Sequence, residues 1–196
     1  MEVAPGNPLP PNGMVWFLDQ VDNQPRLARL HISRTRTNSH RAENIIRAQF
    51  LVLRMSATAE LVGGASKSRF NNRTPAIYVR KAAEDEEAEE EQSQSSPDAK
   101  LIQSHYVLLR LQVDDDRRVV YTFTAWQAGI KQGRHVDEVE SATVEVENGA
   151  WVKITPKQPL EDGEYAVVRL PDDKKSYEPY VYDFGIGPPA PPIPRK

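Results

Sequence analysis

The sequence predicts an all-β protein, an antiparallel β-sandwich of the immunoglobulin-like kind, with a partly open barrel as the alternative. About eight or nine short segments alternate apolar and polar residues with the period of two that strands show. Clusters of Gly, Asn, Asp and Pro separate these segments, and no stretch has a convincing helical period. Many short strands joined by turns are typical of sandwiches and barrels.

Length and composition favour one domain. The chain has 196 residues, of which 39% are hydrophobic and 16 are proline. This length suits one well-buried core, and the low apolar share indicates polar segments outside it. We therefore expect a single β domain over residues 14–187, preceded by an irregular Pro-rich lead at 1–13 and followed by a polyproline-like tail at 188–196.

The first part of the domain contains a hairpin and an ambiguous stretch. An apolar run at 14–18 and a partly alternating run at 26–32 flank turn-forming residues, which predicts a hairpin. The polar segment 33–41 is expected to be a loop. Residues 43–62 fit either a helical face or a buried strand, and their β-branched and aromatic content favours the strand.

The middle of the chain holds one further strand and an acidic insertion. Gly63 and Gly64 break the preceding pattern, and residues 75–80 form a strand opened by a proline, a position where strands tolerate one. Residues 82–99 carry seven acidic side chains between Glu84 and Glu91 and have nothing to bury. We expect this insertion to be a disordered loop.

Two more hairpins follow the insertion. Residues 107–123 alternate on both sides of an Asp-Asp-Asp turn, and residues 127–140 read as a long polar loop. Residues 142–154 form a hairpin around Asn148-Gly149 with two possible registers. A two-residue loop pairs Val144 with Lys153, whereas a three-residue loop pairs Val144 with Val152; the second keeps one face apolar and is the register we predict.

The stretch from Thr155 to Gly187 is expected to form the closing hairpin. Its last strand places Phe184 in phase with Tyr180, Tyr182 and Ile186, which we take as the core face. Asp183 falls on the opposite face and is expected to point to solvent. The motif is therefore interpreted as structural.

The residue types exclude several kinds of chemistry. The chain has no cysteine, which excludes disulfides, thiolate nucleophiles and cysteine-based zinc sites. The four histidines lie far apart without metal-binding spacing, and the Asp-Asp-Asp turn lacks the spacing of a calcium loop. Nucleophile-elbow and phosphate-loop motifs are also missing from the sequence. We therefore expect a non-enzymatic protein with no metal and no cofactor.

The C-terminal third resembles a family of exported bacterial β-sandwich proteins. The resemblance rests on four pieces of sequence: Thr155-Pro156, Pro159-Leu160, Gly163-Glu164-Tyr165-Ala166 and Tyr182-Asp183-Phe184-Gly185. Upstream, Leu61 to Ala65, Pro75 to Val79 and Val107 to Leu111 also look similar. The resemblance implies a β-sandwich in the cell envelope, periplasmic or secreted, although a signal peptide is absent from this chain and a cytoplasmic location is the alternative. It implies no activity and no site.

Charge and aromatic residues supply the candidate binding residues. The net charge of −3 gives no overall attraction to nucleic acid, but the first third is rich in arginine at 26, 29, 34, 36, 41, 47 and 54. The candidates are Trp16, Arg34, Arg36, Trp126 and Trp151. We expect a protein that acts in envelope structure or binds a protein or glycan there; the alternative is a cytoplasmic nucleic-acid-associated protein that uses the Arg-rich region 26–54.

Overall fold

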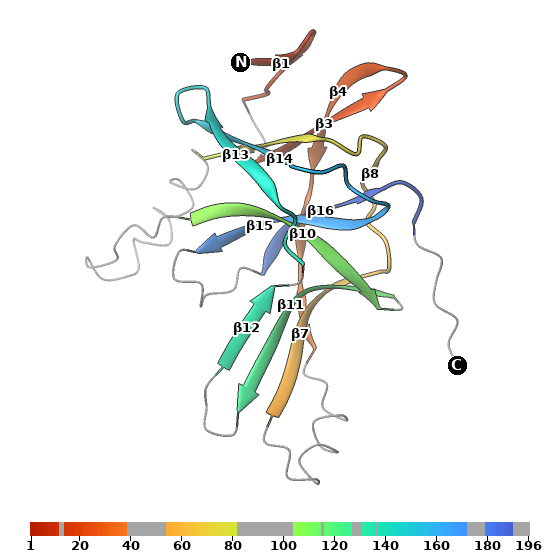
Figure 1. Ribbon diagram of the computed structural model, residues 1–196, viewed down its shortest axis with the longest axis vertical. Helices are drawn as coiled ribbons and strands as arrows, with labels where there is room; N and C mark the ends of the chain where they lie inside the picture. Colours follow the sequence, from red (N-terminus) through yellow and green to blue (C-terminus); the bar gives the residue numbers. More distant parts are fainter. Residues whose placement is uncertain are drawn as a thin grey trace, which may run out of the picture.

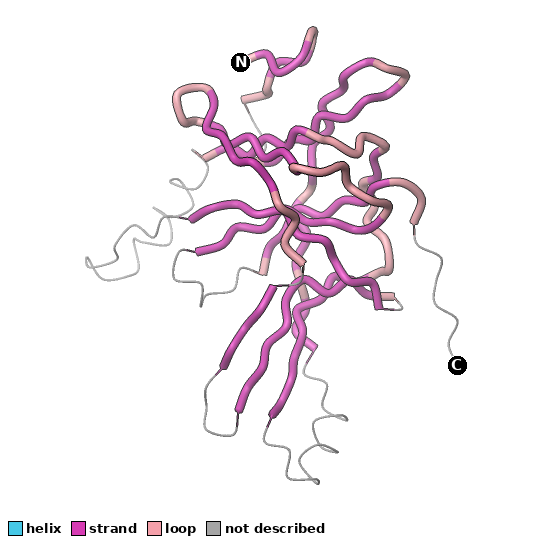
Figure 2. Tube along the Cα trace, in the orientation of Figure 1, coloured by secondary structure: helices cyan, strands magenta, loops and turns pink. Residues whose placement is uncertain are grey.

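The computed structural model describes residues 1–11, 14–38, 54–81, 104–114, 116–126, 131–135, 137–171 and 179–189. All regular structure in these residues is β, which confirms the predicted fold class (Figure 2). None of their segments is a helix long and apolar enough to cross a membrane. The acidic insertion at 82–99, the first part of the ambiguous stretch at 43–53 and the tail from residue 190 lie outside the described residues.

The strands are β1 (Glu2–Ala4), β2 (Asn7–Pro8), β3 (Val15–Val21), β4 (Gln24–Leu30), β5 (Ile32–Arg34), β6 (Arg36–Asn38), β7 (Arg54–Val62), β8 (Arg69–Phe70), β9 (Ala76–Arg80), β10 (Ser104–Asp114), β11 (Arg117–Trp126), β12 (Lys131–His135), β13 (Ser141–Val146), β14 (Trp151–Pro156), β15 (Gly163–Pro171) and β16 (Tyr180–Ile186).

One layer of the molecule is a five-stranded sheet with the order β13-β14-β9-β3-β4 (Figure 1). The predicted first hairpin is its β3–β4 pair. The turn residues Asp22 and Asn23 have φ values of 50° and 61°, as a two-residue hairpin turn of type I′ requires. Asp and Asn tolerate this left-handed region better than most residues, which explains why the hairpin turns there.

The other layer is a larger sheet that almost closes on itself. Its strands follow the path β5-β16-β15-β10-β11-β7-β6, with β12 paired to β11 and β8 to β16. The two ends of this path, β5 and β6, are consecutive in sequence and are separated only by Thr35. The segment 32–38 therefore pairs first with β16 and then with β7, and it brings the sheet close to a barrel.

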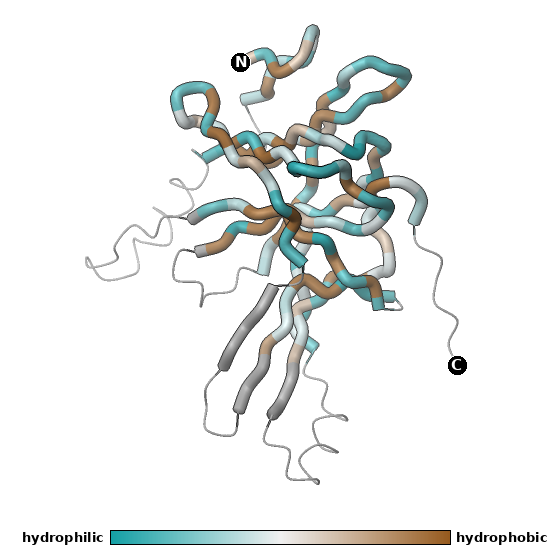
Figure 3. The backbone as a smooth tube through the Cα atoms, in the orientation of Figure 1, coloured by the Kyte–Doolittle hydropathy of each residue, from teal (hydrophilic) through white to brown (hydrophobic). Residues whose placement is uncertain are grey.

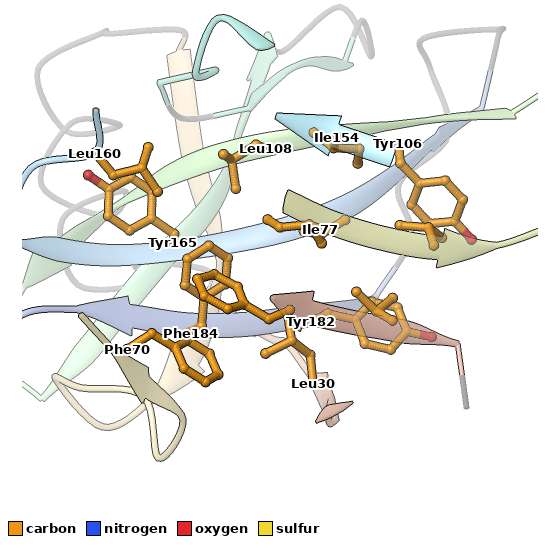
Figure 4. Close-up of a cluster of buried hydrophobic side chains, with 14 of the residues drawn as sticks. Leu30, Phe70, Ile77, Tyr106, Leu108, Ile154, Leu160, Tyr165, Tyr182 and Phe184 are labelled. Carbon is orange, nitrogen blue, oxygen red and sulfur yellow. The ribbon is translucent and has the colours of Figure 1, made fainter. Parts of the chain in front are cut away.

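The main core lies between the two sheets (Figure 4). Phe17 of β3 stacks on Phe70 with ring centroids 4.0 Å apart and meets Phe184 of β16 edge-on at 5.1 Å. Tyr165 of β15 stacks on Phe184 at 5.7 Å. Phe184 and Ile186 are fully buried, as the alternation of the last strand predicts, whereas Tyr180 at the start of that strand is exposed.

A second core fills the space on the other face of β10, β15 and β16, where β7 and β11 cover them. Its members are apolar residues of these strands, namely Leu61, Val107, Leu109, Leu111, Val120, Ala166, Val168 and Val181. Figure 3 shows hydrophobic residues concentrated at the centre of the molecule, where these strands cross. Because the central strands are covered on both faces, the prediction that Asp183 points to solvent is wrong; only 6% of Asp183 is exposed.

The N-terminal segment is ordered, which corrects the prediction of an irregular lead. Residues 2–8 form the short hairpin β1–β2, and Leu9 is buried against Tyr78 and Trp151 on the outer face of the five-stranded sheet. The side chain of Asn7 donates a hydrogen bond to the carbonyl of Pro25 and accepts one from the amide of Leu27. The sequence concealed this packing because Leu9 is surrounded by prolines and no alternation signals a strand.

Three further predictions are corrected by the strand pairing. The expected loop at 33–41 contains β5 and β6, and the expected loop at 127–140 contains β12, which pairs with β11. The β13–β14 hairpin pairs Val144 with Lys153, the register that was not predicted. β13 is an edge strand and 55% of Val144 is exposed, so this face carries no core that would have to stay apolar.

Candidate functional site

The candidate site is a groove of about 520 Å³ at the point where the barrel-like sheet fails to close. One wall is the segment 31–36, which includes β5, and the other is formed by the end of β7 and residues 65–68. Pairing between β6 and β7 extends only from Asn38 to Arg36, so the two walls separate beyond Arg36. Asp183 of β16 and Arg118 of β11 form the floor.

The floor is a buried ion pair. Arg118 Nη1 lies 2.5 Å from Asp183 Oδ2, and the two side chains are only 5% and 7% exposed. Arg118 Nε also donates to the carbonyl of Gly63 at 2.9 Å. Charged groups are buried in this way only when they are paired and hydrogen-bonded, so the floor carries little net charge.

The surroundings of Asp183 keep its carboxyl ionised. Burial alone would raise its pKa, but hydrogen bonds from Ser33 and Ser66 act in the opposite direction. The hydrogen bond and positive charge of Arg118 add to this effect, and the pKa lies below its ordinary value of 3.8. A carboxylate held in this form is a poor proton donor near neutral pH.

A second buried carboxylate fixes the wall at residues 65–70. Glu164 of β15 is 1% exposed, and its Oε2 accepts from the amide of Ser66 at 2.7 Å. Its Oε1 pairs with Arg69 Nη1 at 2.5 Å. Arg69 Nε in turn donates to the carbonyl of Gly187 at 2.8 Å. These contacts join the wall to the last two strands.

The glycine of the Tyr-Asp-Phe-Gly motif is explained by the same network. A Cβ atom at Gly185 would lie 2.2 Å from Arg69 Nη1 and 2.5 Å from its Cζ, which is far inside van der Waals contact. A side chain at this position would have to displace the guanidinium of Arg69 from its contacts with Glu164 and the carbonyl of Gly187. Both Asp183 and Gly185 thus serve the network rather than a solvent-facing surface.

The rim of the groove is cationic and partly apolar. Arg34, Arg36 and Lys67 are exposed, and none of them forms an ion pair with a carboxylate in the described part of the chain. Arg34 lies over the ring of Tyr180 at 6.0 Å. Ile32 and Val62 are 58% and 66% exposed. The groove therefore offers unpaired positive charge beside accessible apolar surface.

An adjoining cavity shares one wall with the groove but differs in charge. Its lining includes Arg36 and also the acidic residues Glu60 and Asp116. Both carboxylates lie 3.4 Å from Arg117, and Glu60 also accepts from Asn38. Arg117 engages both carboxylates, and Glu60 also lies opposite Arg36 in the β6–β7 register, so it lowers the positive charge at that end of the rim.

The structure brings together some of the predicted site residues and separates others. Arg34 and Arg36 both line the groove. Trp16 and Trp151 pack in the cluster under the N-terminal hairpin, and the indole N–H of Trp16 is buried without a partner among the described residues. Trp126 ends β11, but its side chain lies outside the described part. The tryptophans that are described with side chains thus lie outside the groove.

Sequence reasoning missed most residues of this site, among them Ser66, Lys67, Arg118 and Asp183. Ser66 and Lys67 follow a Gly-Gly pair that predicts only the end of a strand pattern, and Arg118 is the second residue after the Asp-Asp-Asp turn. Their spacing carries no motif because they come from three segments that only the fold brings together. The arginine enrichment of the first third was the one usable signal.

Among the described residues, no three His, Asp or Glu side chains converge in a way that could bind a metal ion. The fold and the groove thus define an all-β protein with a cation-rimmed groove. Comparison of the chain with protein-family models, curated proteins and solved structures finds no match.

Proposed function

We propose that this protein is a non-enzymatic binding module that recognises an anionic segment of a partner protein through the groove. The observation that carries the proposal is the rim of Arg34, Arg36 and Lys67, whose charges have no carboxylate partner among the described residues. Exposed cations next to accessible apolar side chains favour an acidic ligand with some apolar content. The buried pair of Arg118 and Asp183 holds the floor of the groove in place and offers no reactive group to a ligand.

Binding of a labelled acidic peptide tests the proposal. We would use an acetylated, amidated peptide of alternating Glu and Val and measure fluorescence anisotropy at low and high salt. The double variant Arg34→Glu/Arg36→Glu is expected to weaken binding by about tenfold, since an exposed ion pair contributes roughly 0.2–1 kcal/mol and charge reversal adds repulsion. Salt should weaken binding to the wild-type protein as well.

A matched control separates the groove from general charge attraction. Arg26 and Arg29 are exposed on β4, in the other sheet, and do not line the groove. Arg26→Glu/Arg29→Glu changes the net charge by the same amount and should leave peptide binding nearly unchanged. Equal losses in the two double variants would mean that the peptide binds through overall charge, and the proposal would be abandoned.

Two other ligands serve as alternatives in the same assay. A single-stranded oligothymidine tests the nucleic-acid reading, and an oligogalacturonate tests an anionic glycan. Tighter binding of the oligonucleotide, lost in the groove variant, would favour nucleic-acid binding, for which the Arg34–Tyr180 pair offers a stacking surface. Tighter binding of the oligogalacturonate would move the assignment to a glycan.

We further propose that the protein works in the bacterial cell envelope. This part rests on the resemblance of the C-terminal motifs to exported β-sandwich proteins and on a cysteine-free chain that needs no particular redox compartment. Immunodetection in fractionated cells of the source organism tests it. Recovery in the cytosolic fraction alone would reject the location without affecting the binding site.

A further inference from the structure

One edge of β5 has no strand beside it in the described part of the chain, and the inference drawn from this edge rests on the proposed function. β5 pairs with β16 in the register Ile32 to Tyr182, Ser33 to Val181 and Arg34 to Tyr180. Its other edge faces the groove and has no strand partner among the described residues, because β7 pairs there with β6 and not with β5, and the opposite wall begins at residues 61–62. A strand edge of this kind presents unpaired backbone donors and acceptors.

The register identifies which backbone groups are free. The amide of Thr35 donates to the carbonyl of Pro179 at 2.8 Å, which extends the β5–β16 ladder by one residue. In an antiparallel pair, successive residues point their N–H and C=O groups alternately toward and away from the partner strand. Ser33 and Thr35 therefore point toward β16, and Ile32 and Arg34 point their backbone groups into the groove.

The side chains around this edge indicate what would pair with it. Arg34, Arg36 and Lys67 surround the edge with positive charge, and Ile32 and Val62 provide apolar contacts at its two sides. A strand of an added peptide sits about 4.8 Å from its neighbour and extends about 3.3 Å per residue. Because Arg36 already pairs with Glu60 of β7, the open segment 32–35 can hold roughly four residues. The groove is open at this place, so β7 does not already occupy the edge.

We propose that the groove captures an extended acidic peptide of a partner protein by adding it as a strand to the free edge of β5. The peptide backbone bonds the N–H and C=O groups of Ile32 and Arg34, while its acidic side chains meet the arginines and Lys67. Main-chain bonds then give affinity that tolerates sequence variation, and the cationic rim gives the preference for acidic segments. The added strand would complete the barrel where β5 and β7 separate.

Amide hydrogen exchange, measured residue by residue with and without the Glu-Val peptide, tests the strand pairing. Ser33 and Thr35 should be protected in the free protein already, whereas Ile32 and Arg34 should exchange fast and become protected by about tenfold or more when the peptide is bound. Protection of Ile32 and Arg34 that does not change on binding would overturn strand addition. Since binding itself is measured separately, that result would leave the groove as a binding site.

Backbone methylation of the peptide provides a second measurement. In an added strand, alternate residues of the peptide point their amides to opposite edges. N-methylation of the Glu set and of the Val set should therefore differ, with one pattern reducing affinity by about tenfold and the other having little effect. Equal effects of both patterns would contradict strand addition, because side-chain contacts alone do not distinguish the two edges.

Discussion

Asp183→Asn is the substitution that best tests the buried ion pair under the groove. It keeps the size of the side chain and removes only the charge that faces Arg118. Breaking a buried pair by removing one partner costs about 3–5 kcal/mol, because the remaining charge stays buried. Arg118 keeps Glu164 at 3.6 Å and the carbonyl of Gly63, so we expect the lower end of this range, about 3 kcal/mol of unfolding free energy.

Urea denaturation followed by tryptophan fluorescence measures this loss, since Trp151 is buried. The control is Asp162→Asn, which removes the same charge from an ion pair that is half exposed, 2.6 Å from Arg73. An exposed pair of this kind contributes about 0–1 kcal/mol. If Asp183→Asn costs no more than Asp162→Asn, the buried pair does not stabilise the fold and the reasoning fails.

The pH dependence of the same pair has a definite sign. The pKa of Asp183 is lower in the folded protein than its ordinary value, so the carboxylate contributes stability above that ordinary value. This contribution is lost as the pH falls through the folded pKa. The difference in unfolding free energy between wild type and Asp183→Asn should therefore be constant near neutral pH and shrink in acid below about pH 4. A difference that grows on acidification would contradict this assignment.

The remaining predictions concern the core, the network and one turn. Phe184→Ala should cost about 3–5 kcal/mol in urea denaturation, because it leaves a cavity at the centre of the aromatic cluster; a loss below that of a surface substitution would reject this. Gly185→Ala should displace the guanidinium of Arg69 and lower the thermal midpoint, because overpacking of this kind costs about 1–3 kcal/mol. A crystal structure of the variant with Arg69 in its original position would contradict this prediction. Asn23→Val should cost roughly 1–2 kcal/mol by its positive φ, and Asn23→Gly should be close to neutral; similar midpoints for the two would argue against the turn geometry.

Strand positions were predictable where the pattern of side chains is local. The hairpins of residues 15–30, 104–126 and 163–186 follow from alternation and from turn residues, and the structure confirms them. The core face of the last strand was also correct for Phe184 and Ile186. Periodicity gives these results because successive strand residues necessarily point to opposite faces.

Short polar strands were not predictable in the same way. β5 and β6 consist of residues such as Arg34, Arg36 and Asn38, which carry no alternation of apolar and polar character. They are strands because β16 and β7 offer them partners, and those partners are far away in sequence. The register of the β13–β14 hairpin failed for a related reason, since its edge position removed the apolar face on which the prediction relied.

The all-β class, most strand positions and one face of the central strands follow from local patterns in the sequence. The tertiary structure alone decided that the second face of those strands is covered, and this made Asp183, Glu164 and Arg118 a buried network instead of surface charges. The alternation of side chains predicts that the two faces of a strand differ, but it does not predict which other strands pack against the second face. The groove likewise exists only because the segment 32–38 changes partner from β16 to β7, a contact between residues distant in the chain that no local pattern encodes.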